Sequence, residues 1–236
     1  ITTVAPAGTT GDWLIDPVDF NIQAIGGDIT GAELTALLVN NNVTISTMVT
    51  GTDTGTEFFA DPGQGDINVN DEIGRLASWT AAGTPTTLTL MAANDVNINS
   101  AITATNGNLF VCCGRDVNVR AAITTTNGSV SLNAGQDVTL FAGSAMTTTN
   151  GNIQLCAGRD VTVNSKITLT DSGSIAGQSL GLPLGLTLIA GANGSGPGVA
   201  SGSVYLPDAA SPLRPTVTRS GASVTDIAIY YNPTSY

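Results

Sequence analysis

The sequence contains no histidine and only one lysine, Lys166, among 236 residues. Without histidine, the chain has no Ser-His-Asp or Cys-His nucleophilic centre and no zinc site that uses histidine. A Ser-Lys pair would depend on Lys166, and no serine motif accompanies that residue. The sequence therefore predicts a protein that is not an enzyme, with no catalytic residues, no cofactor and no cofactor-binding residues.

Charge is also scarce. Charged residues make up 11% of the chain, less than half of the usual level of about 25%, and the net charge is −11. The few basic residues are scattered, whereas nucleic-acid binding requires a basic patch. An anionic membrane surface would repel the chain, and it has no apolar run of the length that spans a bilayer. We therefore expect neither a nucleic-acid partner nor membrane insertion.

Threonine, asparagine, glycine, alanine and valine dominate the composition. Threonine and valine favour strands, while asparagine and glycine favour the turns between strands. An internal repeat of about 21 residues orders them. Its first marker is an aspartate followed by an alternating strand, found at Asp95, Asp116, Asp137 and Asp160. Its second marker is an Asn-Gly pair, found at Asn106, Asn127 and Asn150.

The period of the repeat selects the fold. Helical-hairpin repeats need more than about 30 residues, whereas three short strands and their corners fit a single solenoid coil. We predict an all-β, right-handed parallel β-helix (β-solenoid) with about 21 residues per coil and coils about 4.8 Å apart. Aliphatic residues fill the coil, while threonine and asparagine coat it. Leu34, Leu37 and Leu38 are spaced as on one helical face and predict a short helix near 32–39.

The predicted β-helix covers residues 13–206. Residues 1–12 form an N-terminal extension or arm. From Pro207 onward, several prolines interrupt the regular pattern. We therefore predict that residues 207–236 are an irregular C-terminal tail that acts as an end cap, a linker or an arm onto a neighbouring subunit. Within it, Val217–Val224 and Ile227–Tyr231 could still form strands.

The four aspartates of the repeat lie at equivalent corners, one coil apart, and form a predicted structural ladder together with the three asparagines. An aspartate before a strand can accept hydrogen bonds from backbone N–H groups of its turn. Arg115 and Arg159 precede two of these aspartates and would offset repulsion along the ladder. The alternative is a glycan-cleaving site, since hydrolases hold two carboxyl groups about 5–10 Å apart.

A second acidic group contains the weak calcium candidates Asp53, Asp61, Asp66 and Asp71. Calcium prefers clustered oxygen ligands, but the chain has neither the EF-hand spacing nor the glycine-rich nonapeptide repeat. A solvated loop is the simpler interpretation, and we expect no metal site.

Cys112 and Cys156 fall in one repeat column with Asn133 between them, so about 9.6 Å separates them. A disulfide needs Cα atoms within about 7 Å, so no bridge between the two is expected. Strand alternation directs Cys113 inward, into a column of alanines, and Cys112 outward. The exposed Cys112 or Cys156 could link to a neighbouring molecule.

Several motifs together resemble the repeat region of filamentous-haemagglutinin-like exoproteins. The residues that carry the resemblance are Trp13-Leu14-Ile15-Asp16-Pro17, Phe20-Asn21-Ile22, Leu34 with Leu37-Leu38, Asn42-Val43-Thr44-Ile45-Ser46-Thr47, Gly65-Asp66-Ile67-Asn68-Val69-Asn70, Leu88-Thr89-Leu90-Met91-Ala92 and Tyr231-Asn232-Pro233-Thr234-Ser235-Tyr236. The resemblance implies a right-handed β-helix, two-partner export across a bacterial outer membrane, and an adhesin or stalk role.

The expected function is that of an extracellular structural or adhesive β-solenoid on a bacterial cell surface, as a stalk or a self-assembling filament subunit. Its expected partners are further copies stacked head-to-tail or neighbouring parts of a longer parent chain. The alternatives are a carbohydrate-active enzyme on the same scaffold, or binding of surface glycans or ice by threonine rows such as Thr124–Thr126 and Thr147–Thr149.

Overall fold

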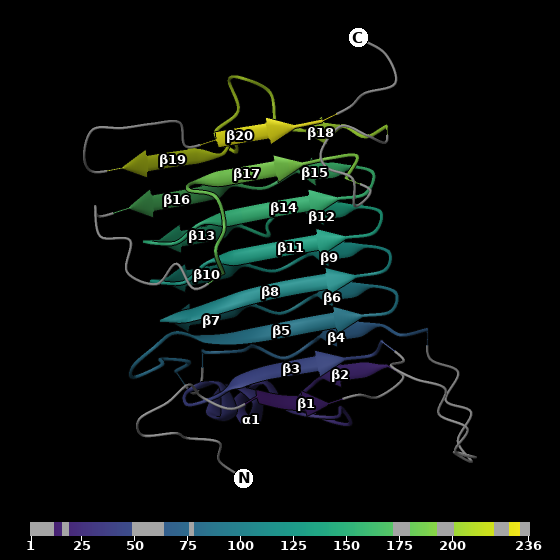
Figure 1. Cartoon of the computed structure of the whole chain (residues 1–236), viewed down its shortest axis with the longest axis vertical. Helices are drawn as coiled ribbons and strands as arrows, with labels where there is room; N and C mark the ends of the chain where they lie inside the picture. Colours follow the sequence, from purple (N-terminus) through teal and green to yellow (C-terminus); the bar gives the residue numbers. More distant parts are fainter. Residues whose placement is uncertain are drawn as a thin grey trace.

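A computed structural model describes residues 12–15, 19–48, 64–75, 78–171, 180–192, 201–219 and 227–231, with the backbone path alone for 12–15. The predicted fold is confirmed: these residues form a parallel β-helix whose coils stack along one axis (Figure 1). Every pairing between neighbouring strands in the described part is parallel.

The described strands form three sheets, each contributing one side of the coil. Sheet A contains β1 (Asp12–Ile15), β3 (Asn42–Ser46), β5 (Thr86–Ala92), β8 (Gly107–Cys113), β11 (Val130–Ala134), β14 (Ile153–Ala157), β17 (Leu186–Ile189) and β20 (Ile227–Tyr230). Sheet B contains β2 (Phe20–Ile22), β4 (Ile67–Val69), β6 (Val96–Ile98), β9 (Val117–Val119), β12 (Val138–Leu140), β15 (Val161–Val163) and β18 (Val204–Tyr205). Sheet C contains β7 (Ile102–Thr105), β10 (Ile123–Thr126), β13 (Met146–Thr149), β16 (Ile167–Asp171) and β19 (Thr216–Arg219).

Each coil passes through sheets A, B and C in turn and then re-enters sheet A one level higher. Residues one repeat apart are therefore direct neighbours: Val130 pairs with Leu109 below it and with Ile153 above it. At a strand spacing of about 4.8 Å, this register places identical corners directly over one another.

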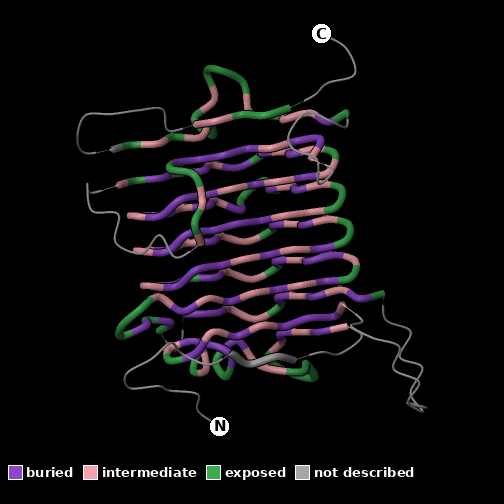
Figure 2. Tube along the Cα trace, viewed as in Figure 1, coloured by how far each residue is buried: buried purple, intermediate pink, exposed green. Residues whose placement is uncertain are grey.

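The core is a narrow tube of stacked aliphatic side chains. Along most strands, inward buried positions alternate with part-exposed ones, as the colours in Figure 2 show. Leu109, Val111, Val130 and Leu132 are all fully buried. Burying apolar area contributes about 25 cal/mol per Å², and each coil gains that area only by contact with its neighbours.

Helix α1 (Gly31–Leu38) takes the place of a sheet C strand in the first coil. The prediction of a helix at 32–39 is correct to within one residue at each end. Thr30 caps the helix by accepting the Glu33 N–H, and hydrogen bonds from Thr30 keep the pKa of Glu33 below its ordinary value. Leu34 and Leu38 are fully buried against the tube. Among the described residues, no helix has the length and apolarity to cross a membrane.

The β-helix extends beyond the predicted boundary at residue 206. Strand β19 pairs with β16 in sheet C, and β20 pairs with β17 in sheet A. The described part of the proline-containing tail thus continues the winding, because the prolines Pro207, Pro212 and Pro215 lie in the connections and leave the strands free to pair.

The corner before sheet A requires two special residue types. Asn106, Asn127 and Asn150 have φ values of 55°, 53° and 57°, a left-handed conformation that asparagine tolerates better than most residues. The glycine that follows each of them lies close to the coil below. A Cβ atom on Gly128 would stand 1.9 Å from the Gly107 carbonyl oxygen. The Asn-Gly repeat therefore meets two requirements of this corner, a left-handed backbone at the first residue and no side chain at the second.

We predict that Gly128→Ala lowers the free energy of unfolding by about 1–3 kcal/mol, because an overpacked site must push two coils apart. The matched control is Gly83→Ala, where a Cβ atom would meet nothing within 4 Å. Urea denaturation followed by circular dichroism measures both variants. Equal stability of the two variants would contradict the close approach of the coils.

Candidate functional surfaces

The aspartate ladder is a chain of hydrogen bonds between successive coils. Each carboxylate accepts the backbone N–H of the equivalent residue in the next coil. The acceptor and donor residues are Asp66 and Asp95 (3.0 Å), Asp95 and Asp116 (3.0 Å), Asp116 and Asp137 (3.1 Å), Asp137 and Asp160 (3.1 Å), and Asp160 and Ser203 (2.8 Å). The carboxylates thus join one coil to the next, whereas the sequence suggested bonds within a single turn.

Two arginines offset part of the negative charge of this ladder. Arg115 Nε donates to Asp95 at 2.8 Å, and its Nη2 forms a second hydrogen bond to the same carboxylate. Arg159 binds Asp137 through the same two nitrogens, and its Nε donates to the carboxylate at 2.8 Å. The hydrogen bonds and negative charge of Asp95 and Asp137 raise the pKa values of Arg115 and Arg159 respectively. Each arginine therefore offsets repulsion by binding the aspartate of the coil below. That aspartate lies one coil away from the aspartate that follows the arginine in sequence.

These contacts occupy the carboxylates that a glycan-cleaving site would need. A general acid or nucleophile must reach its substrate directly. In the described ladder, the carboxylate oxygens are instead directed at backbone N–H groups and guanidinium groups. The arrangement is chemically suited to fastening coils together.

Asparagines form a second ladder on the outer face of sheet B. Each amide donates to the amide oxygen of the coil below, at 3.0–3.1 Å, through Asn21, Asn68, Asn97 and Asn118. Arg120 donates to Asn97 at 3.1 Å and lies 4.6 Å from the centroid of the Phe141 ring. The predicted corner ladder behaves similarly, with Asn127 donating to Asn106 at 3.2 Å and Asn150 to Asn127 at 2.9 Å.

The two calcium candidates that the structure describes, Asp66 and Asp71, have different hydrogen-bond partners. Asp66 belongs to the aspartate ladder, and Asp71 accepts the N–H of Gly31 at 2.8 Å, which holds the start of α1. Asp53 and Asp61 lie outside the described residues. Within the described ranges, no group of three or more potential ligands from histidine, cysteine, aspartate and glutamate is arranged to hold a metal ion.

The cysteines occupy the positions that their repeat columns predict. Asn133 pairs with Cys112 on one side and with Cys156 on the other, so two coil steps separate the thiols. Cys112 and Cys156 are half-buried, and Cys113 is buried in the column of Ala92, Ala134 and Ala157. Burial raises the pKa of Cys113 to about 12 and also raises that of Cys156.

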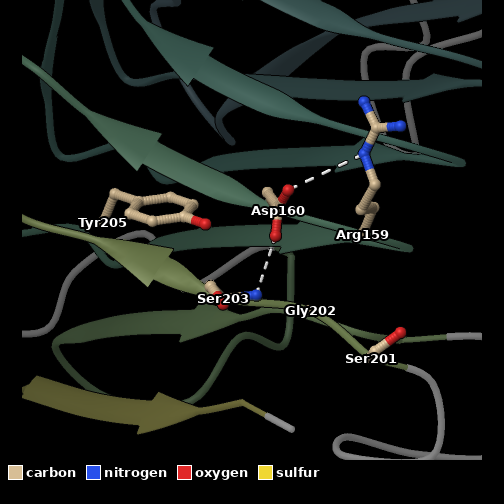
Figure 3. A pocket seen from close by; sticks show the side chains of 6 residues that line it. All are labelled: Arg159, Asp160, Ser201, Gly202, Ser203 and Tyr205. Atoms are coloured by element: carbon tan, nitrogen blue, oxygen red, sulfur yellow. Dashed lines mark hydrogen bonds and ion pairs between the residues drawn. The ribbon is translucent and has the colours of Figure 1, made fainter. Parts of the chain in front are cut away.

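A hollow of about 240 Å³ lies at the corner between β15 and β18. Figure 3 shows the Asp160 carboxylate between Arg159 and the backbone N–H of Ser203, with Tyr205 on one side and Ser201 on the other. Asp160 is the single carboxylate among the residues that line the hollow. Glycoside hydrolysis usually requires a pair. Asp160 is instead the last carboxylate of the aspartate ladder in the described chain, where it accepts the Ser203 N–H.

Sequence reasoning missed the first two members of the aspartate ladder, Asp19 and Asp66. Asp19 accepts the N–H of Asp66 at 2.8 Å and thereby extends the aspartate ladder downward. The signal was a local motif, an aspartate followed by an apolar, a polar and a second apolar residue, which also occurs at Asp19–Ile22 and Asp66–Val69. Long insertions between these copies broke the 21-residue spacing and hid them.

Comparison of the chain with protein-family models, with curated proteins and with solved structures gives no match. The function must therefore be argued from the surfaces of the β-helix itself.

We predict that Asp116→Ala lowers the free energy of unfolding by about 1–3 kcal/mol, because the N–H of Asp137 loses its acceptor. Asp116→Asn keeps an acceptor oxygen in the same place and should retain most of the stability. Thermal and urea unfolding of both variants provides the measurement. If asparagine were as damaging as alanine, the negative charge would matter more than the hydrogen bond.

We predict that Cys113 resists iodoacetamide in the folded protein at pH 8, because it is 6% exposed and its thiolate is scarce at a pKa of about 12. Peptide mass spectrometry should find Cys112 and Cys156 alkylated first, and all three equally alkylated in denaturant. Cys113→Ala, which copies the alanines of its column, serves as the control. Equal native rates at Cys112 and Cys113 would overturn the inward assignment.

Proposed function

We propose that the chain is a structural rod of an exported bacterial surface protein, acting as a stalk or filament subunit and not as an enzyme. The observation that carries this proposal is the unbroken register of the coils. Sheet A continues from β1 to β20 across the described residues, and its neighbouring strands are aligned residue by residue. Eight strands at a spacing of about 4.8 Å give a rod roughly 35 Å long.

The ladders support a mechanical role. Amide, carboxylate and guanidinium groups tie each coil to the next along sheet B and its corner, in addition to the backbone hydrogen bonds of the sheets. Because each coil contacts only its neighbours, such a rod can be lengthened by adding coils without redesign of the core. An adhesin stalk and a filament both need this property.

The last described coil at the C-terminal end leaves apolar residues partly exposed. Leu186 and Leu188 are fully buried in β17, but their column partners in β20 are not: Ile227 is half-buried and Ile229 is 40% exposed. An exposed strand edge with apolar residues favours pairing with a further strand. A further coil, from a second copy or from a longer parent chain, would bury Ile229 and continue the tube.

We predict that the purified chain associates end-to-end as its concentration rises, and that Ile229→Asp shifts it toward monomers. The matched control is Tyr230→Asp, one residue away on β20, where the side chain is 47% exposed. Analytical ultracentrifugation and negative-stain electron microscopy measure the assemblies. We expect rods that lengthen with concentration for the unsubstituted chain and for Tyr230→Asp.

Two outcomes would count against this proposal. If the unsubstituted chain stays monomeric at every concentration, that result would contradict head-to-tail assembly and leave the stalk as the sole structural role. Cleavage of an acidic polysaccharide by the purified chain would overturn the structural proposal altogether.

A further inference from the structure

Sheet C presents a surface unlike those of the other two sheets. Figure 1 shows its five strands stacked along the axis. Each of these described strands carries threonine at both outward positions. The first column consists of Thr103, Thr124, Thr147, Thr168 and Thr216, and the second of Thr105, Thr126, Thr149, Thr170 and Thr218. All of these side chains are exposed or half-buried. Thr80 continues the second column by bridging to Thr105.

The threonine array is a regular two-dimensional lattice. Neighbouring coils repeat it about every 4.8 Å, and alternate residues along a strand repeat it about every 6.6 Å. The strands pair without slippage, since Thr124 lies against Thr103 on one side and Thr147 on the other. Threonine is β-branched and has a restricted χ1 angle, so the methyl and hydroxyl groups are held in few orientations.

The hydroxyls of this array have no hydrogen-bond partner elsewhere in the described structure. The inward threonines between the columns behave differently: Thr125 donates to the Gly128 carbonyl at 2.7 Å and Thr148 to that of Gly151 at 3.4 Å. The asparagines of sheet B likewise bond to one another. Hydroxyls that the protein leaves unpaired must be satisfied from outside the chain.

We propose that this threonine array is an ice-binding surface, on which hydroxyl-bound and methyl-caged water adopts the spacing of the ice lattice. Surface water that is already ordered costs little further entropy when it joins the crystal. The array is uncharged along β7, β10 and β13, so it would not hold the ions and strongly oriented water that charged groups attract. This proposal needs only a single chain and therefore stands apart from end-to-end assembly.

A glycan is a less fitting ligand for the same face. Small-ligand and sugar sites are usually concave and combine apolar or aromatic walls with a few varied polar groups. The array is one face of a parallel sheet, with a single residue type and no aromatic side chain in either column. Repetition in two dimensions matches a crystalline lattice better than a single flexible chain.

The test uses the unsubstituted chain. A nanolitre osmometer measures its thermal hysteresis, and a slowly grown ice hemisphere tests whether ice captures it. Thr147→Tyr places a bulky ring in the centre of the array and should remove most of both activities. Thr139→Tyr makes the same change on the outer face of sheet B and should leave thermal hysteresis and ice capture as they are in the unsubstituted chain. Circular dichroism and thermal unfolding verify that both variants are folded.

Thr147→Ser keeps the hydroxyl and removes the methyl group, and it should lose part of the activity while remaining fully folded. Absence of thermal hysteresis and of ice capture in the parent chain would overturn the proposal. An equal loss of both activities in Thr147→Tyr and Thr139→Tyr would also overturn it. So would binding of the unsubstituted chain to insoluble cellulose or chitin together with its exclusion from ice.

Discussion

The whole structure depends on hydrogen bonding between parallel coils that are held in register. A slip of one residue in any strand would turn its aliphatic side chains outward and its polar ones inward. The buried columns, such as Leu109, Val130 and Ile153, penalise that slip through lost apolar burial. The polar ladders penalise it a second time, because a shifted Asp116 would no longer meet the N–H of Asp137.

The same register gives each outer face its chemistry. On sheet B, stacked amides satisfy one another, and the adjoining corner pairs aspartates with backbone N–H groups and arginines. On sheet C, stacked threonines point their hydroxyls outward without partners in the described chain. One rule of repetition therefore gives sheet B polar groups that bond to one another and gives sheet C hydroxyls that have no partner among the described residues.

The sequence was enough to predict the fold where the spacing is regular. Asp95, Asp116, Asp137 and Asp160 lie on successive coils because each intervening segment has nearly the same length. Asp19 escaped notice because 47 residues separate it from Asp66, its partner on the next coil. Prolines set the tail apart from the regular coils, although its two strand candidates overlap β19 and β20. The repeat spacing does not reveal which groups each carboxylate binds. Those partners, the backbone N–H groups and arginines of the next coil, depend on how the corners are oriented in space.

The most direct test of the account is the distance between spin labels placed on the outer face of sheet B, in a background without native cysteines. Labels at Asn97, Asn68 or Asn21 are each paired with one at Thr162, and pulsed electron paramagnetic resonance measures the separations. The account predicts that the distance grows by the same increment of about 4.8 Å at each step, because each site lies one coil further away. Unequal increments that follow the 29-residue and 47-residue separations in sequence would contradict the stacking of coils.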